Sequence, residues 1–301
     1  MNKAIRIGTR DSQLALWQAE TVQQKLEEQG YQTQLVPVKS DGDLNLSQPL
    51  YELGITGIFT KTLDIALING SIDIAVHSMK DVPTLLPKGI VQAAVLKRAS
   101  VTDVLIPGPD TTSNIVATGS LRRKAQWLNR FPEDQITGLR GNVNSRLRKL
   151  VESNWKGAIF AKAGLERIEL LPENHQELDW MIPAPAQGAM TIAAMGTNTL
   201  ALEACEKLNH APTQICTRVE REFLRDLEGG CTAPIGAIAS LDGEQLNLAG
   251  ILLSLDGTKA LKVNKTISAD QIQGFGAQCA REILENGGSE LMQEIRKEMN
   301  S

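Results

Sequence analysis

The chain has 301 residues, a length that favours two or three domains over one compact core. Of these residues 42% are hydrophobic and 22% are charged, which is the composition of a globular protein. The net charge of −4 argues against a general nucleic-acid binder, and no run of about 18 apolar residues predicts a membrane span. The first residues carry no secretory signal, so we expect a cytoplasmic protein. Its four cysteines form no CxxC pair, and we therefore expect free thiols without disulfides or zinc.

The first region predicts alternating strands and helices. A helix is expected after the first strand because apolar residues recur there at helical spacing, with Asp11 or Ser12 as its cap. In chain order we predict a strand over 5–9, this capped helix ending at Gly30, a strand over 34–38, a helix over 57–69 and a strand over 72–76. This order is typical of a mostly parallel sheet.

A second region repeats this plan. It predicts strands over 114–118, 135–139 and 157–161, helices over 121–130 and from Asn144, and a helical stretch over 164–171. Ser120 can cap the first of these helices. After the Pro-rich loop 182–189, residues 190–195 predict a strand that returns to the first sheet.

The third region differs in kind. A helix is predicted from Pro212 to Leu227, and three strands then meet across Asp242-Gly243 and Asp256-Gly257, which are strong hairpin signals. Two helices close the chain. The expected fold is α/β with three domains: two mostly parallel-sheet domains, 1–97 with 189–208 and 98–188, and a C-terminal α+β domain, 209–301, with a three-stranded antiparallel sheet.

Arginines recur where predicted strands turn into helices. Arg10 and Arg140 follow strands, Arg122 and Arg123 occupy the first turn of a helix, and Arg146 lies on the next helix. One such arginine would be an ordinary surface charge. Cations are unfavourable at helix N-termini, so their repetition indicates a bound anion. Without a P-loop or GxGxxG motif, a polycarboxylate is the better ligand than a nucleotide.

Two further positions stand out. Lys80 and Asp81 come where a strand ends, which is the edge at which α/β sheets bind ligands. His77, three residues before Lys80, could be a base, but beside a strand end we expect a packed or capped imidazole. Cys231 lies in the stretch LEGGCTAP. A lone cysteine is more often a buried apolar residue, but a Gly-rich loop favours a reactive or modified thiol.

These stretches together resemble the porphobilinogen deaminase (hydroxymethylbilane synthase) family. The matching motifs are HSMKDVP (77–83), SLRR (120–123), LRGN (139–142), AQGA (186–189) and LEGGC (227–231), and the resemblance covers nearly the whole chain. It implies stepwise condensation of four porphobilinogens into a linear tetrapyrrole, hydroxymethylbilane, with release of ammonia. It also implies lobes like those of type II periplasmic binding proteins, and a dipyrromethane cofactor joined to Cys231 by a thioether.

The resemblance assigns a role to each matching position. Asp81 would be catalytic, because an ionised carboxylate stabilises the positive charge that develops as ammonia leaves. The cofactor would be held by Asp43, Ser78, Lys80, Ser120, Arg122, Arg123 and Arg146. The substrate and growing chain would be held by Arg10, Ser12, Phe59, Arg140, Arg167 and Gln187. No metal, nucleic acid or membrane is implied, and we expect a monomer with porphobilinogen as substrate.

The chain also departs from the family pattern. Residues 54–57 lack a usual lysine, Asp41 stands where an arginine is common, Gly119 replaces a serine and Ala186 replaces a glycine. These changes put loop motion in doubt more than the chemical step. The alternative function is that of a non-enzymatic, two-lobed polycarboxylate-binding protein. For Arg122→Leu or Arg123→Leu we expect impaired cofactor assembly or chain elongation. Stability should be unchanged or slightly raised, since a cation leaves a helix N-terminus.

Overall fold

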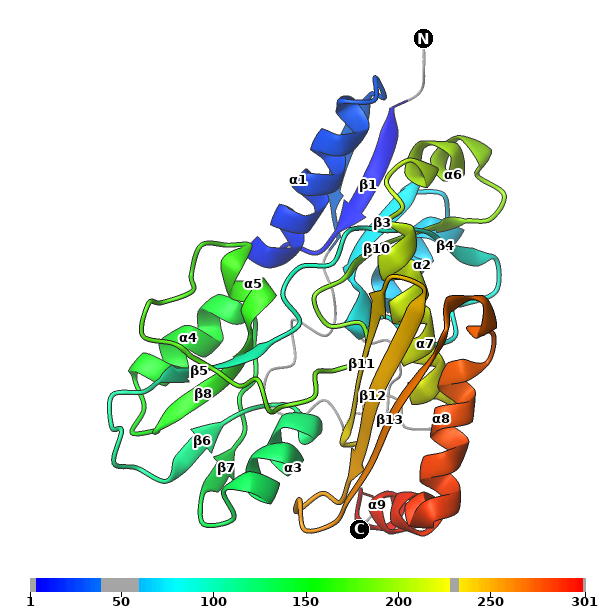
Figure 1. Ribbon diagram of the computed structural model, residues 1–301. Helices are drawn as coiled ribbons and strands as arrows, with labels where there is room; N and C mark the ends of the chain where they lie inside the picture. The colour runs from blue at the N-terminus through cyan, green and yellow to red at the C-terminus, as the bar shows by residue number, and fades with distance from the viewer. Residues whose placement is uncertain (1–3, 39–59, 228–232, 300–301) are drawn as a thin grey trace.

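The computed structural model describes residues 4–38, 60–227 and 233–299. Its strands are β1 (Ile5–Thr9), β2 (Thr33–Pro37), β3 (Ile74–Ser78), β4 (Ile90–Val95), β5 (Asp103–Pro107), β6 (Ile115–Ala117), β7 (Gln135–Thr137), β8 (Gly157–Ala161), β9 (Gln176–Glu177), β10 (Met190–Met195), β11 (Ile235–Asp242), β12 (Gln245–Leu253) and β13 (Ala260–Ser268). Its α-helices are α1 (Gln13–Glu27), α2 (Lys61–Ile68), α3 (Leu121–Arg130), α4 (Val143–Val151), α5 (Lys162–Glu166), α6 (Thr199–Glu206), α7 (Ala211–Asp226), α8 (Phe275–Ile283) and α9 (Ser289–Met299). Figure 1 shows three groups of these elements, each built on its own sheet.

The first sheet has the strand order β2-β1-β3-β10-β4. β1 runs parallel to β2 and β3, whereas β10 runs antiparallel to β3 and β4. The predicted return of residues 190–195 to this sheet is confirmed. Because β1 and β3 are parallel, the residues that follow them, including Arg10 and Lys80, lie at the same edge of the sheet.

The second sheet repeats this arrangement with the order β7-β6-β8-β5-β9. β6 is parallel to β7 and β8, and β5 is antiparallel to β8 and β9. The caps were predicted correctly: the Ser12 hydroxyl accepts from the Ala15 N–H at the start of α1, and the Ser120 hydroxyl accepts from the Arg123 N–H at the start of α3. The parallel strands again bring the starts of α3, α4 and α5 to one edge.

The third sheet, β11-β12-β13, is antiparallel throughout. Its two turns carry Gly243 at φ +56° and Gly257 at φ +77°, as the two Asp-Gly pairs predicted. α7 packs against the sheet through Phe223, which is fully buried. A Cβ on Gly250 would lie 2.6 Å from the Phe223 ring, so glycine is needed for this close approach.

A buried ion pair joins the third sheet to the rest of the molecule. Glu220 of α7 is fully buried and pairs with Arg98, which lies between β4 and β5, at 2.6 Å. The same carboxylate accepts from the backbone N–H groups of Ala186 at 2.6 Å and Ala239 at 2.7 Å. The predicted fold class is thus confirmed, while the domain boundaries stay a prediction.

Candidate active site

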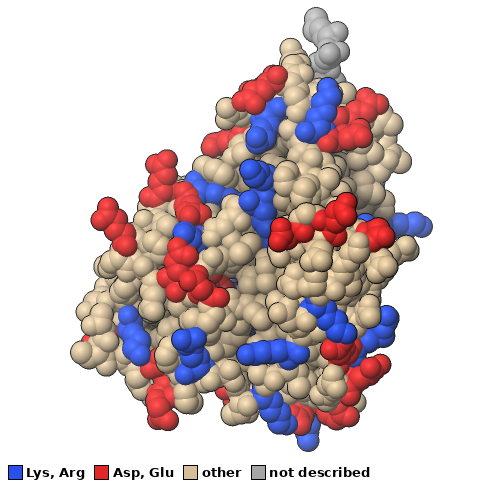
Figure 2. All heavy atoms as spheres, viewed as in Figure 1, with Lys and Arg blue, Asp and Glu red and all other residues tan. Residues whose placement is uncertain are grey.

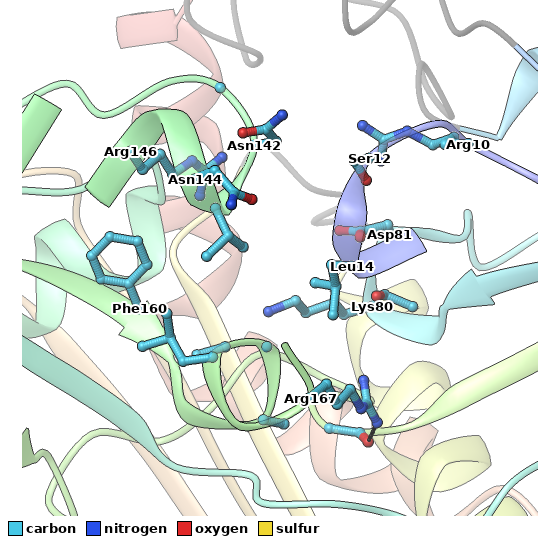
Figure 3. A pocket seen from close by; sticks show the side chains of 18 of the residues that line it. Arg10, Ser12, Leu14, Lys80, Asp81, Asn142, Asn144, Arg146, Phe160 and Arg167 are labelled. Atoms are coloured by element: carbon cyan, nitrogen blue, oxygen red, sulfur yellow. Dashed lines mark hydrogen bonds between the residues drawn. The ribbon is translucent and has the colours of Figure 1, made fainter. Parts of the chain in front are cut away.

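A cleft of about 220 Å³ lies between the first two sheets, at the edges where their parallel strands end. Its walls come from the turn after β3, the β1–α1 turn, the start of α4, the β8–α5 turn and the loop before β10 (Figure 3). Six cationic side chains line it: Arg10, Lys80, Arg123, Arg140, Arg146 and Arg167. Among its described lining residues, Asp81 is the only carboxylate.

The cleft is therefore strongly positive in a chain whose net charge is −4. The outer face in Figure 2 shows Lys and Arg interspersed with Asp and Glu. A cleft lined by one sign of charge concentrates field lines and attracts ligands of the opposite sign. The ligand that fits such a cleft is a polyanion.

Lys80 and Asp81 belong to a 3-10 turn, Met79–Asp81, that directly follows β3. Met79 is buried and anchors the turn, which ends at Val82 because Pro83 cannot continue a helix. The Lys80 ammonium donates to Gln187 Oε1 at 3.2 Å and points into the cleft (Figure 3). Burial, reinforced by the charge of Arg123, lowers the pKa of Lys80 to about 8.

Arg122 and Arg123 are both buried, and both pair with Asp103, the first residue of β5. Arg122 Nη2 lies 2.8 Å from Asp103 Oδ2, and Arg123 donates to Asp103 Oδ1 from Nη2 at 2.7 Å and from Nε at 3.1 Å. Burial alone would raise the pKa of Asp103, but the two guanidinium charges outweigh it and hold that pKa below its usual range. Asp103 is thus the internal counter-ion of the arginine pair.

This geometry changes one expectation from the sequence. Loss of Arg122 or Arg123 would leave a buried carboxylate with half of its compensation, which costs far more than the helix dipole returns. We therefore predict that both leucine variants are destabilised, in place of the unchanged or slightly raised stability expected from the sequence.

Arg146 and Arg167 are two further cations that line the cleft. Burial, and then the charge of Arg123, lowers the pKa of Arg146 to about 10. Its Nε is buried without a hydrogen-bond partner in the described parts of the chain. Arg167 donates to the Gly188 carbonyl at 2.7 Å, and burial lowers its pKa to about 10. A buried cation with an unused N–H favours an anionic ligand.

The structure brings together most of the predicted site residues. The ones that line the cleft are Arg10, Ser12, Ser78, Lys80, Asp81, Arg123, Arg140, Arg146 and Arg167. Ser120, Arg122 and Gln187 lie behind it: Ser120 caps α3, and Gln187 is fully buried and donates to Asp103 Oδ1 at 2.9 Å. Asp43, Phe59, Cys231, Asp41 and positions 54–57 lie outside the described residues.

His77 is buried, as predicted, and burial together with the charge of Arg10 lowers its pKa to about 4. Asp103, by contrast, was not identified from the sequence. A single carboxylate at the start of an otherwise apolar strand, DVLIP, was the available signal, because such a residue needs a buried partner. Gln18 was missed as well, and its side-chain amide donates to the Ser78 hydroxyl at 2.8 Å.

The structure shows the backbone environment of two positions that depart from the family pattern, Ala186 and Gly119. Ala186 is fully buried at φ +63°, a left-handed conformation that favours glycine. Gly119 lies so close to the Leu139 carbonyl that a Cβ there would be 2.5 Å from its oxygen. A serine at position 119 would thus require a backbone shift in this chain.

The fold and the cleft define a class: an α/β protein with a cationic cleft between two lobes and, among the described lining residues, a single carboxylate at a strand end. Two family models match the chain, "Porphobilinogen deaminase, dipyromethane cofactor binding domain" over residues 5–203 and "Porphobilinogen deaminase, C-terminal domain" over residues 214–285. The chain belongs to the porphobilinogen deaminase family, enzymes of tetrapyrrole synthesis that use a dipyrromethane cofactor.

Curated relatives agree over nearly the full length. The porphobilinogen deaminase of Desulfitobacterium hafniense is 42% identical, with 97% of this chain and 98% of the relative covered. That of Syntrophotalea carbinolica is 39% identical, with 97% and 96% covered. These matches do not favour the alternative of a non-enzymatic binding protein.

Among solved structures, the periplasmic VFT2 domain of Bordetella pertussis BvgS is similar at a TM-score of 0.41 and 10% identity, covering 68% of this chain and 86% of that one. The L-cystine solute receptor of Neisseria gonorrhoeae gives a TM-score of 0.38 and 11% identity, covering 69% and 85%. Both are too distant to bear on the function. Within residues 4–38, 60–227 and 233–299, no helix is both long and apolar enough to cross a membrane.

Proposed function

We propose that this chain is a hydroxymethylbilane synthase, a transferase that joins four porphobilinogens head to tail and releases ammonia at each step. The observation that carries the proposal is the cleft in which Asp81 is the single carboxylate among the described lining residues, facing six cations. Porphobilinogen carries acetate and propionate groups as well as an aminomethyl group. Cations suit the first two, and a carboxylate suits the charge that forms when the amine leaves.

The cleft residues fit a dipyrromethane. Its acetate and propionate groups need cationic donors, and Lys80, Arg123 and Arg146 lie together in the cleft, with the buried Nε of Arg146 unused by its described neighbours. We assign these three residues and Ser78 to holding it, with Asp43, Ser120 and Arg122 as further candidates and Cys231 as its attachment point. When bound, dipyrromethane supplies the pyrrole to which the substrates are joined.

The substrate side of the cleft is assigned in the same way. Arg10, Ser12 and Arg140 lie at strand-to-helix turns, and Arg167 directly follows α5; Phe59 and Gln187 complete the set. Guanidinium groups bind carboxylates through paired hydrogen bonds, so they can orient porphobilinogen with its aminomethyl carbon toward the acceptor pyrrole.

Asp81 supplies the chemical step in this proposal. As the aminomethyl C–N bond breaks, the electron pair leaves with ammonia and positive charge spreads over the substrate's pyrrole ring. An ionised carboxylate fixed beside the pyrrole N–H stabilises that charge where it forms, without reorganising solvent. The turn after β3 thereby places a carboxylate binder, Lys80, next to a cation stabiliser, Asp81.

The test compares Asp81→Asn and Asp81→Glu with the parent, all carrying the cofactor as verified by intact mass. We expect consumption of porphobilinogen to fall by about a hundredfold or more in Asp81→Asn, and by less in Asp81→Glu because the charge remains. Substrate should still bind, since its carboxylates are held by the arginines. An Asp81→Asn enzyme as fast as the parent would make Asp81 a structural turn residue and refute the proposed mechanism.

The remaining assignments belong to the same proposal. We propose three domains, 1–97 with 189–208, 98–188 and 209–301, a monomeric state and a cytoplasmic location. The strand memberships of the three sheets support the division, because β10 joins the first sheet after the chain has built the second. Limited proteolysis and sedimentation would test the domain boundaries and the oligomeric state.

A further inference from the structure

Arg221 of α7 reaches across from the C-terminal region to the turn that carries Lys80 and Asp81. Its guanidinium donates to three backbone carbonyls, from Nη1 to Val82 at 2.8 Å and to Met79 at 3.3 Å, and from Nη2 to Pro83 at 2.6 Å. These three carbonyls bracket the turn on both sides of Asp81. One side chain thus fixes the entry and the exit of this segment.

Buried Met79 anchors the start of the turn, and its N–H donates to the Ala189 carbonyl at 3.0 Å. The segment is a single 3-10 turn without a side-chain cap, and its internal hydrogen bond runs from the Val82 N–H to the Met79 carbonyl at 3.2 Å. Pro83 prevents it from continuing as a helix that would satisfy further carbonyls. The guanidinium fork can reach several carbonyls at once from one rigid plane, which a lysine ammonium cannot reproduce with the same geometry.

Glu220, the residue before Arg221 on α7, holds a second segment beside the cleft. Glu220 binds the N–H of Ala186 in the loop before β10, so adjacent residues of one helix hold two segments beside the cleft. α7 lies between the first sheet and the third sheet in Figure 1. Its C-terminal end leads along the chain toward Cys231.

We infer that Arg221 is a positioning residue for the reaction: it sets the place of Asp81 relative to the helix that leads to the cofactor-bearing cysteine. This inference rests on the proposed role of Asp81. Arg221 is not among the described residues that line the cleft. It acts by holding the backbone on which the Asp81 carboxylate is carried, and small displacements of such a group are costly in rate.

The test uses Arg221→Met, which keeps the apolar stem of the side chain, and Arg221→Lys, which keeps its charge. Both are prepared with the cofactor attached, as confirmed by intact mass, and assayed well below their melting temperatures. We expect kcat to fall by about ten- to a hundredfold in Arg221→Met with KM within about twofold of the parent, and a partial recovery in Arg221→Lys. Arg218→Met, at an exposed position of the same helix, is the matched control and should keep the parental kcat.

A double-mutant cycle separates positioning from mere stability. In an Asp81→Asn background, Arg221→Met should slow single-turnover addition of porphobilinogen by less than about threefold, because the carboxylate that Arg221 positions is already gone. An unchanged kcat in Arg221→Met, or an equal loss in both backgrounds, would overturn the inference. Should Arg221→Met not fold, the same cycle with Arg221→Lys decides the question. A fully active Asp81→Asn enzyme would instead refute the proposed mechanism itself, so the two failures are distinguishable.

Discussion

Replacing Arg123 with leucine should destabilise the protein through Asp103, a residue 20 positions away in the chain. In the parent, Arg123 donates two hydrogen bonds to Asp103, at 2.7 and 3.1 Å. It donates a third to the Ile159 carbonyl at 3.0 Å. Asp103 is fully buried, so the variant leaves a carboxylate with only Arg122 and Gln187 to compensate it.

Removing one partner of a buried ion pair typically costs about 3–5 kcal/mol. Because Arg122 remains, the lower end applies, and we expect the free energy of unfolding to fall by about 3 kcal/mol. For 301 residues unfolding as one unit, that corresponds to a drop in Tm of roughly 5 °C. Arg148→Leu, at an exposed position of α4, is the matched control and should change stability by no more than about 0.5 kcal/mol.

The decisive measurement adds Asp103→Asn to both backgrounds and follows urea unfolding. In the parent this change should be destabilising, since it leaves Arg122 and Arg123 without their counter-ion. In Arg123→Leu it should cost less, since the carboxylate has already lost its hydrogen bonds from Arg123 and only Arg122 then loses its counter-ion. The same loss from Asp103→Asn in both backgrounds would refute the assignment of Asp103 as the counter-ion.

The dependence on pH gives a second check. Because the folded-state pKa of Asp103 is held below its unfolded value of about 3.9, its contribution is fully present above that value and is lost as pH falls toward the folded pKa. The parent should therefore lose stability on acidification below about pH 4 more steeply than Arg123→Leu. Equal slopes would contradict the proposed pairing.

Three further predictions concern the cofactor, the pH range and the loop before β10. Cys231→Ser should fold, but its intact mass should lack the two linked pyrroles. An adduct on Cys205, Cys216 or Cys279 would contradict this. Burial raises the pKa of these three thiols, to about 12 for Cys205 and about 11 for Cys279, and so disfavours the nucleophilic thiolate. If the Lys80 ammonium binds cofactor carboxylates, the rate at which cofactor-free protein acquires its adduct should decline above about pH 8. Lys80→Arg should move this decline to higher pH. The same pH profile in both proteins would exclude a role for the Lys80 ammonium in binding. Ala186→Gly should raise stability by up to about 1 kcal/mol, because it removes left-handed strain at φ +63°, and a lower Tm would instead mean that the lost Cβ contacts outweigh that strain.

Local signals in the sequence determined the elements and two of the turns. Ser120 was identified as a helix cap, and Ser12 as one of two candidates with Asp11, because a short polar side chain just before an apolar period satisfies free N–H groups. That rule needs only a few neighbouring residues. The Asp-Gly pairs predicted the two turns of the third sheet for a similarly local reason. The end of β3 identified Lys80 and Asp81, because parallel strands bring the residues at their carboxyl ends to one edge of the sheet.

The tertiary structure alone decided which charges have buried partners within the protein. The sequence placed Arg122 and Arg123 in a first helical turn and indicated an external anion, yet both pair with Asp103 from a different strand. Arg98 pairs with Glu220 across 122 positions of the chain, and Arg221 binds the Val82 carbonyl across 139. Periodicity and capping act over a few residues, whereas buried charges choose partners by where the packed sheets place them, so no local pattern could have distinguished Arg123 from Arg146.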